Sequence, residues 1–167
     1  NERIDYWFPK TQKDRLGIIL GRINDIRNDD VRDFYLVAFS QILKSCSIWL
    51  QKSVKPTRDP NKIPAEPLDT FLRRARSMLK RNEELWNRLP LKVKKNLESF
   101  RVVKLSDARS LPLDNCSSAV VVTSPPYVTS YEYADLHQLS ALWLQYCNSL
   151  PEFRKQFIGT AYAERQD

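Results

Sequence analysis

The feature that most constrains this chain is an apolar, β-branched run, residues 119–123, which ends directly in Ser124-Pro125-Pro126-Tyr127. Such a run predicts a short strand. The two prolines cannot continue a β-ladder and hold φ at about −65°, so the backbone must turn rigidly just past the strand. The turn would bring a hydroxyl, a carbonyl and an aromatic ring together. These groups suit a planar ligand with an exocyclic amine, because the oxygens accept its N–H bonds while the ring stacks on its face.

The hydrophobic period changes along the chain. Apolar residues at helical spacing predict helices over about 11–27, 31–50, 68–88 and 131–147, with a short helix within 91–100. The sequence Asn28-Asp29-Asp30 breaks the first helix and predicts a cap for the second. The β-branched runs 101–105 and 118–123 predict two neighbouring parallel strands. We therefore expect an α/β protein with a helical region, 1–100, and a sheet-containing region, 101–167.

Some residues are expected to be buried. The helix over 68–88 is predicted to bury one apolar side, and the four tryptophans are expected in the core rather than at a binding surface. The residues concerned are Leu72, Met78, Leu79, Leu85 and Trp86 on that helix, and Trp7, Trp49, Trp86 and Trp143.

Composition narrows the function classes. The net charge of +7 favours an anionic partner such as nucleic acid, although a basic surface without a partner explains the charge equally well. No apolar run approaches the ~20 residues that a membrane span needs, and no signal-peptide pattern opens the chain. Three widely spaced cysteines without a CxxC pair predict reduced thiols in a cytoplasmic protein. A single histidine argues against a zinc site.

Residues 123–127, Thr-Ser-Pro-Pro-Tyr, resemble the catalytic motif of the DNA amino-methyltransferases, which read Asp/Asn/Ser-Pro-Pro-Tyr/Phe/Trp. The serine form is most typical of enzymes that methylate cytosine N4. Similarity to that family continues on both sides of the motif, in residues 107–113 and 131–137, and upstream in residues 6–9, 39–40 and 52–59. The resemblance therefore covers most of the chain.

The resemblance implies a fold, a cofactor, a partner and roles for particular residues. It implies part of a Rossmann-like class I methyltransferase domain with a large helical N-terminal part. The cofactor would be S-adenosylmethionine, the partner double-stranded DNA, and the setting restriction–modification or host marking. The catalytic turn would be Ser124, Pro125, Pro126 and Tyr127, with Ser124 and the Pro125 carbonyl accepting from the cytosine amino group and Tyr127 stacking on the flipped base. Asp107 and Ala108 would bind the adenine of the cofactor.

The glycine-rich turn of that family is not found in this sequence. The chain has 3 glycines; Gly17 and Gly21 fall within a helical pattern, and Gly159 stands alone. We therefore expect a partial methyltransferase, completed by a second chain or a missing segment that carries the glycine-rich cofactor motif. Two alternatives remain open: methylation of adenine N6, and a non-catalytic DNA-binding or assembly subunit of a split methyltransferase.

A basic, proline-rich loop is predicted over residues 51–67. Lys52, Lys55 and Arg58 are candidates for contacts with DNA phosphates. The alternative is a solvated loop in which Arg58 pairs with its neighbour Asp59. The charges on the helix over 68–88 are expected to be a solvated face, and His137 is expected to have a structural role.

Overall fold

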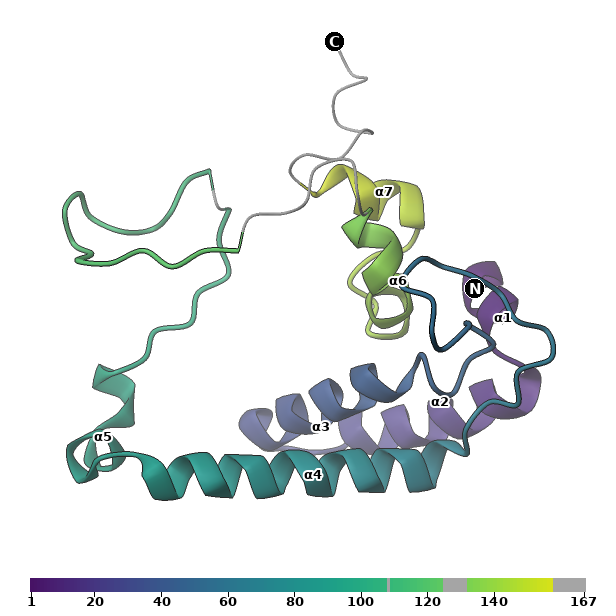
Figure 1. Ribbon diagram of the computed structural model, residues 1–167, viewed down its shortest axis with the longest axis horizontal. Coiled ribbons are helices and arrows are strands. Elements are labelled where there is room, and N and C mark those ends of the chain that lie inside the picture. The colour runs from purple at the N-terminus through teal and green to yellow at the C-terminus, as the bar shows by residue number, and fades with distance from the viewer. Residues whose placement is uncertain (108, 125–131, 158–167) are drawn as a thin grey trace, which may run out of the picture. The chain divides into compact units, whose positions relative to one another are not determined.

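The computed structural model describes residues 1–107, 109–124 and 132–157. These residues form helices joined by loops (Figure 1). In chain order the helices are α1 (Glu2–Trp7), α2 (Lys10–Asn24), α3 (Asp29–Ile42), α4 (Pro67–Arg88), α5 (Leu91–Lys95), the 3₁₀ helix η1 (Leu97–Ser99), α6 (Tyr133–Trp143) and α7 (Leu150–Lys155). The described part of the chain has no strand, and its isolated β-bridge joins Trp49 to Arg58.

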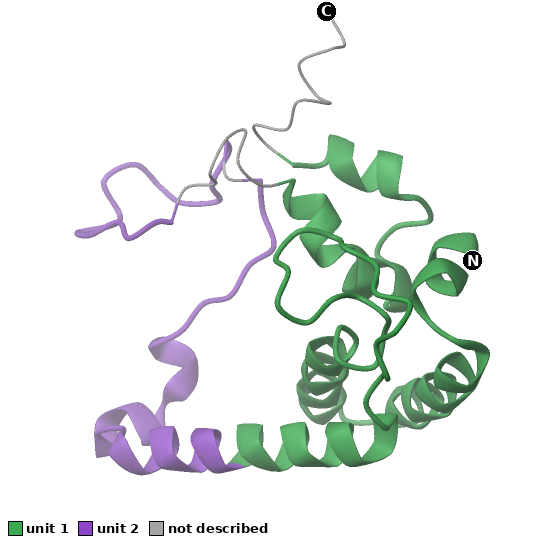
Figure 2. Ribbon diagram, turned by 45° about the vertical axis from the view of Figure 1, so that its right-hand side comes forward, with its two compact units in different colours: residues 1–79, 127–167 green, residues 80–126 purple. Residues whose placement is uncertain are grey.

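The chain divides into two compact units, which Figure 2 shows in different colours. The first comprises residues 1–79 and 127–167, and the second residues 80–126. The predicted division into residues 1–100 and 101–167 stays a prediction.

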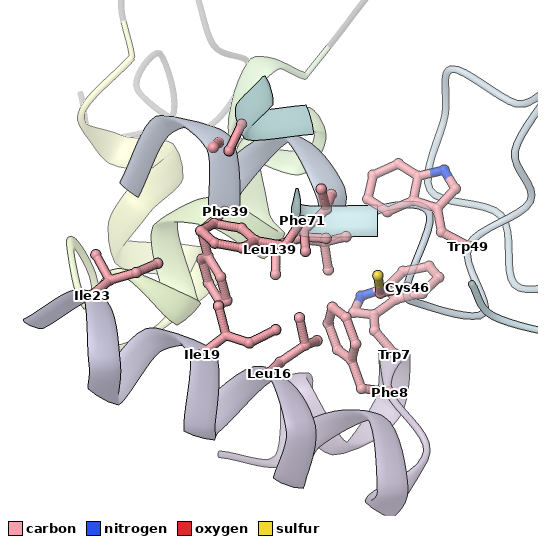
Figure 3. Close-up of a cluster of buried hydrophobic side chains, with 14 of the residues drawn as sticks. Trp7, Phe8, Leu16, Ile19, Ile23, Phe39, Cys46, Trp49, Phe71 and Leu139 are labelled. Carbon is pink, nitrogen blue, oxygen red and sulfur yellow. The ribbon is translucent and has the colours of Figure 1, made fainter. Parts of the chain in front are cut away.

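The core of the first unit is built from α2, α3, α6 and the start of α4. Helices α2 and α3 pack side by side, and α6 contacts α1 and α7. Figure 3 shows Leu16 and Ile19 of α2 close to Phe39 of α3, in a cluster that also contains Phe71 of α4 and Leu139 of α6. Burial of one such side chain contributes about 1.5–3 kcal/mol to the stability of the fold. This cluster confirms the apolar stripe that helical spacing predicts for residues 11–27.

Side-chain caps fix where several helices begin. The Asn28 side chain accepts a hydrogen bond from the backbone N–H of Val31, which confirms the predicted cap of α3. Ser149 caps α7 in the same way by accepting from the N–H of Glu152. Helices α1 and α7 are not predicted from the sequence, because six residues are too few for a hydrophobic period to show.

Helix α3 ends at Ile42, eight residues before the predicted end at residue 50. Beyond it, local hydrogen bonds of Ser47 and a bond from Ile48 to α1 take the place of the helical pattern. The Ser47 hydroxyl donates to the Lys44 carbonyl and accepts from the Trp49 N–H. The Ile48 N–H donates to the Trp7 carbonyl at 2.9 Å. These bonds place Ile48 and Trp49 in the core without a helix.

The predicted α/β fold is wrong for the residues that the structure describes. Neither 101–105 nor 118–123 forms a strand, and the apolar side chains of both runs lie in solvent. Val103 is 90% exposed, Leu105 is fully exposed and Val122 is 92% exposed. β-Branched residues favour strands because they pack on a pleated, half-buried surface. No neighbouring strand is present in the described ranges, so a partial Rossmann-like sheet is not formed.

The predicted buried side of α4 is also wrong in part. Pro67, Phe71 and Ala75 are the buried residues, and the ring centroids of Phe71 and Tyr35 lie 5.9 Å apart. Trp86 is 45% exposed, so it is not the core residue that the sequence predicts. Only the first part of α4 packs on the core, and the apolar residues of its later turns remain exposed. They are Leu79, Leu85 and Trp86, with Leu72 exposed on an earlier turn.

Candidate functional site

The basic loop that follows α3 is ordered by backbone hydrogen bonds. The N–H of Leu50 donates to the Thr57 carbonyl, and the N–H of Asp59 donates to the Ile48 carbonyl, each at 2.8 Å. The Lys62 ammonium donates to the carbonyls of Lys44 and Trp49, at 2.8 and 2.7 Å. Partial burial lowers the pKa of Lys62, and the charge of Lys44 lowers it further. Lys62 therefore holds the loop together rather than projecting from it.

Lys52, Lys55 and Arg58 are exposed on this loop, where a phosphate could reach them. The Arg58 guanidinium lies 4.8 Å from the centre of the Tyr6 ring of α1. Asp59 accepts instead from the N–H of Asn61 at 3.0 Å, and within the described ranges it forms no ion pair with Arg58. The Arg58–Asp59 pair of the alternative interpretation is therefore absent from the described residues, and Arg58 contacts Tyr6 instead. Phosphate binding by these cations stays a prediction.

Asp107, the predicted acceptor for the cofactor's adenine, is an exposed carboxylate in the second unit. It accepts from Arg109 through the backbone N–H at 2.8 Å and through Nη2 at 2.6 Å. These bonds hold the pKa of Asp107 at about 2, chiefly through the guanidinium. The group is therefore an ionised acceptor at neutral pH. Ala108, its predicted partner in the cofactor site, lies outside the described residues.

Ser124 also belongs to the second unit. It is exposed, and it is the last residue of the described range 109–124. Pro125, Pro126 and Tyr127 lie outside the described residues. Asp107 and Ser124 are thus the members of the predicted methylation site that the structure describes.

Helix α6, which follows the Ser-Pro-Pro-Tyr segment in the chain, is fixed by a buried glutamine. Gln138 is fully buried, and its Oε1 accepts from Nε of Arg3 and Nε1 of Trp7, both at 3.0 Å. Its Nε2 donates to the Asp135 carbonyl at 2.8 Å. The partners in α1 are 131 and 135 residues away in sequence, so no local pattern indicates this contact.

A second polar contact ties α6 to α7. The Asp135 carboxylate accepts from Nη2 of Arg154 at 2.8 Å and from its Nε at 3.1 Å. His137, on the same helix, is exposed. Helix α6 is therefore held to α1 through Gln138 and to α7 through Asp135.

The first unit contains a large open pocket of about 720 Å³. Its polar lining includes Arg3 and Tyr6 from α1 together with Asn148, Ser149 and Arg154. A smaller pocket of about 280 Å³ lies between α3, the basic loop and α6, with Trp49, Leu136 and Ser140 in its lining. Neither pocket includes Asp107 or Ser124.

Within the described ranges, no group of three or more histidine, cysteine, aspartate or glutamate side chains is arranged to hold a metal ion. None of the helices described combines the length and the apolar character that crossing a membrane requires.

The chain is similar to the Type II methyltransferase M.MvaI of Kocuria varians. The two sequences are 28% identical over 155 residues, which cover 86% of this chain and 33% of the relative. The chain therefore spans about a third of the length of the relative it matches. No protein-family model matches the chain, and no solved structure matches it. The similarity is a distant relationship, and it supports the general resemblance to DNA methyltransferases, whereas the motif of residues 123–127 stays a prediction.

Proposed function

We propose that this chain supplies the base-binding part of a DNA methyltransferase that transfers a methyl group from S-adenosylmethionine to N4 of cytosine. One observation carries the proposal: Thr-Ser-Pro-Pro-Tyr, residues 123–127, stands in a chain most of which is similar to a Type II methyltransferase. The serine at the first position of the motif favours cytosine N4 over adenine N6. The exposed position of Ser124 supports a role in contact with substrate.

The proposed chemistry is positioning and direct transfer. The target cytosine leaves the duplex, because its amino nitrogen cannot be reached inside the base stack. The Ser124 hydroxyl and the Pro125 carbonyl accept the two N–H bonds of the amino group, which leaves its lone pair directed at the methyl donor. Tyr127 stacks on the base, a contact worth about 1–3 kcal/mol in single-stranded complexes. Bound S-adenosylmethionine would supply an activated methyl group, with its S–CH3 bond breaking as the N–CH3 bond forms, and one amino proton would be released to solvent.

The proposed cofactor site uses Asp107 and Ala108. The Asp107 carboxylate already accepts four hydrogen bonds from Arg109, two on each oxygen. Binding of the adenine amine would therefore replace one of these bonds. A glycine-rich segment in a second chain, or in a segment outside the printed sequence, would supply the rest of the pocket.

DNA is the proposed partner, and Lys52, Lys55 and Arg58 are its proposed phosphate contacts. The net charge of +7 and the exposure of these residues on an ordered loop support this. A rigid loop loses less conformational entropy when it binds than a flexible one does. We place the protein in the cytoplasm, in a restriction–modification system.

Nucleoside analysis tests the proposal. The whole reading frame that encodes this chain is expressed in a bacterial host that lacks DNA methyltransferases, alone and together with any second chain that carries the glycine-rich motif. The host DNA is digested to nucleosides and analysed by mass spectrometry. N4-methyldeoxycytidine is the expected product. N6-methyldeoxyadenosine would overturn the choice of base and support the alternative specificity. DNA without a new methylated nucleoside would support a non-catalytic binding or assembly subunit instead.

A further inference from the structure

Two arginines from separate parts of the chain converge on one exposed aromatic ring. Tyr6 of α1 is 43% exposed, and its ring packs edge-on against Trp7 with a centroid separation of 4.9 Å. The Cζ atoms of Arg3 and Arg58 lie 5.3 and 4.8 Å from the centre of the Tyr6 ring. A guanidinium at this distance is attracted by the negative face of the ring, so Tyr6 helps to hold both cations in place.

Among the residues that the structure describes, no carboxylate pairs with the two arginines at this ring. Arg3 donates its Nε to Gln138, which is a neutral amide. Within the described ranges neither Arg3 nor Arg58 forms an ion pair with a carboxylate, whereas Arg32 pairs with Asp29 at 2.7 Å and Arg154 pairs with Asp135 at 2.8 Å. Two like charges near one ring repel each other, and a bound anion would relieve the repulsion.

Two of these three residues, Arg3 and Tyr6, lie beside space that a ligand can enter, whereas Arg58 reaches the site only through its contact with Tyr6. Arg3 and Tyr6 line the pocket of about 720 Å³, whose lining also includes the polar side chains of Asn148 and Ser149. Guanidinium groups bind phosphate oxygens through paired N–H bonds, and amide and hydroxyl groups donate to the same oxygens. Glu2 also lines the pocket, which favours a singly charged phosphodiester over a free dianion.

We propose that Arg3, Tyr6 and Arg58 form a phosphodiester-binding site for the DNA backbone. The site rests on the proposed function for the identity of its ligand. It extends the phosphate contacts predicted for the basic loop to α1, beside the helix that Gln138 fixes. Tyr6 positions the guanidinium groups, Arg3 and Arg58 donate to the phosphate, and the loop cations Lys52 and Lys55 contact neighbouring phosphates.

DNA binding by this chain tests the site without requiring methyl transfer. Fluorescence anisotropy with a fluorescein-labelled 20-base-pair duplex gives Kd over a range of sodium chloride concentrations. One lost phosphate contact reduces the steepness of log affinity against log salt by about 0.9. Between 1 M and ~0.1 M salt, this difference in slope corresponds to an about eightfold weaker Kd for the variant. We expect Arg58→Gln and Arg3→Gln each to weaken binding by about five- to tenfold at ~0.1 M salt and to reduce the slope by about 0.9.

Arg22→Gln is the matched control. Arg22 is an exposed cation of α2 that pairs with Asp25. Its replacement removes the same charge from a helix other than the one that carries Tyr6. We expect less than a twofold change in Kd for this variant. Arg3→Gln also removes a donor to Gln138, so circular dichroism checks the fold of this variant. Arg58 has no such buried partner. If the Arg3 variant unfolds, the affinity of Arg58→Gln decides the outcome.

Three results would overturn the site: no binding of the duplex by the folded chain, an unchanged Kd and slope for Arg58→Gln, or an equal loss for Arg22→Gln. The last result would mean that binding follows net charge alone. Failure of the site is distinguishable from failure of the proposed function. Methylated nucleosides with an unchanged Arg58→Gln affinity would remove only the site, whereas a weakened Arg58→Gln variant without any methylation would remove only the catalytic proposal.

Discussion

The helical core and the segment of residues 101–124 both contain strongly apolar runs, but only the core buries them. Leu16 and Phe39 have no exposed surface, whereas Val103 and Leu105 are almost entirely in solvent. The two kinds of run need different neighbouring elements in order to be buried. An amphipathic helix can bury its stripe against two neighbouring helices of the same unit, whereas a β-branched run needs strands on either side.

The residues proposed for methyl transfer lie in the exposed segment and not in the buried core. Asp107 and Ser124 lie in the segment whose apolar residues are exposed. Contiguous exposed apolar residues are typical of surfaces that contact another protein. Under our proposal, the second chain or further segment that completes the cofactor site would also cover residues such as Val103 and Val122.

The largest expected effect is in the core. Phe39→Ala should lower the free energy of unfolding by about 3–5 kcal/mol, because it removes a fully buried ring that packs edge-on against Trp143. Val37→Ala, at an exposed position of the same helix, should change it by less than about 1 kcal/mol. Urea denaturation followed by tryptophan fluorescence measures both. A loss below 1 kcal/mol for Phe39→Ala would contradict this description of the core.

The next effect concerns the polar anchor of α6. Gln138→Leu leaves the buried Nε1 of Trp7 without its acceptor and should cost about 1–3 kcal/mol in unfolding free energy. The matched control is Gln41→Leu, because Gln41 is exposed on α3 and should tolerate the change within ~0.5 kcal/mol. Equal stabilities of the two variants in urea would show that Gln138 anchors nothing.

A smaller effect is expected from Cys46 at high pH. Burial raises the pKa of its thiol to about 11, with the Glu66 carboxylate as a lesser cause. The raised pKa means that the folded protein holds the proton more tightly than the unfolded chain, so its stabilising effect is complete below pH 9 and is lost as the pH rises through 11.

Unfolding free energies of the wild type and of Cys46→Ala, measured at several pH values, separate this effect from the titration of lysines and tyrosines. Between pH 9 and 11 the wild type should lose on the order of 1 kcal/mol more than the variant. Parallel curves would show that the thiol is not buried in the folded protein.

The smallest effect is expected in the exposed segment. Val103→Asp and Val122→Asp should each change the free energy of unfolding by no more than about 0.5 kcal/mol, because neither side chain contributes to a core. A loss above ~2 kcal/mol for either variant would mean that the segment packs on the protein in solution, and the contrast with the core would not hold.

Helical periodicity and capping predicted much of the fold. They identified α2, α4 and α6 and the Asn28 cap, because these features depend on residues close together in sequence. The sequence Ser149-Leu150-Pro151-Glu152 also carries a capping box with an early proline, which could have indicated α7.

Other features had no local signal. The burial of Gln138 depends on donors in α1, more than 130 residues away, and the contact of Arg58 with Tyr6 joins a loop to that helix. The predicted strands failed because a β-branched run specifies a strand only together with the strands beside it. In the candidate site, the roles of Asp107 and Ser124 stay predictions from the sequence, and the structure adds the pairing of Asp107 with Arg109 and the position of Arg58.

The most direct test of the central proposal is methyl transfer by a Ser124→Ala variant. The protein encoded by the whole reading frame is assayed for transfer of tritium-labelled methyl groups from S-adenosylmethionine to unmethylated DNA. Ser117→Ala is the control, since Ser117 is an exposed serine of the same segment. We predict that Ser124→Ala abolishes transfer and Ser117→Ala retains it, with both variants folded. Full transfer by Ser124→Ala would contradict the assignment of the catalytic turn.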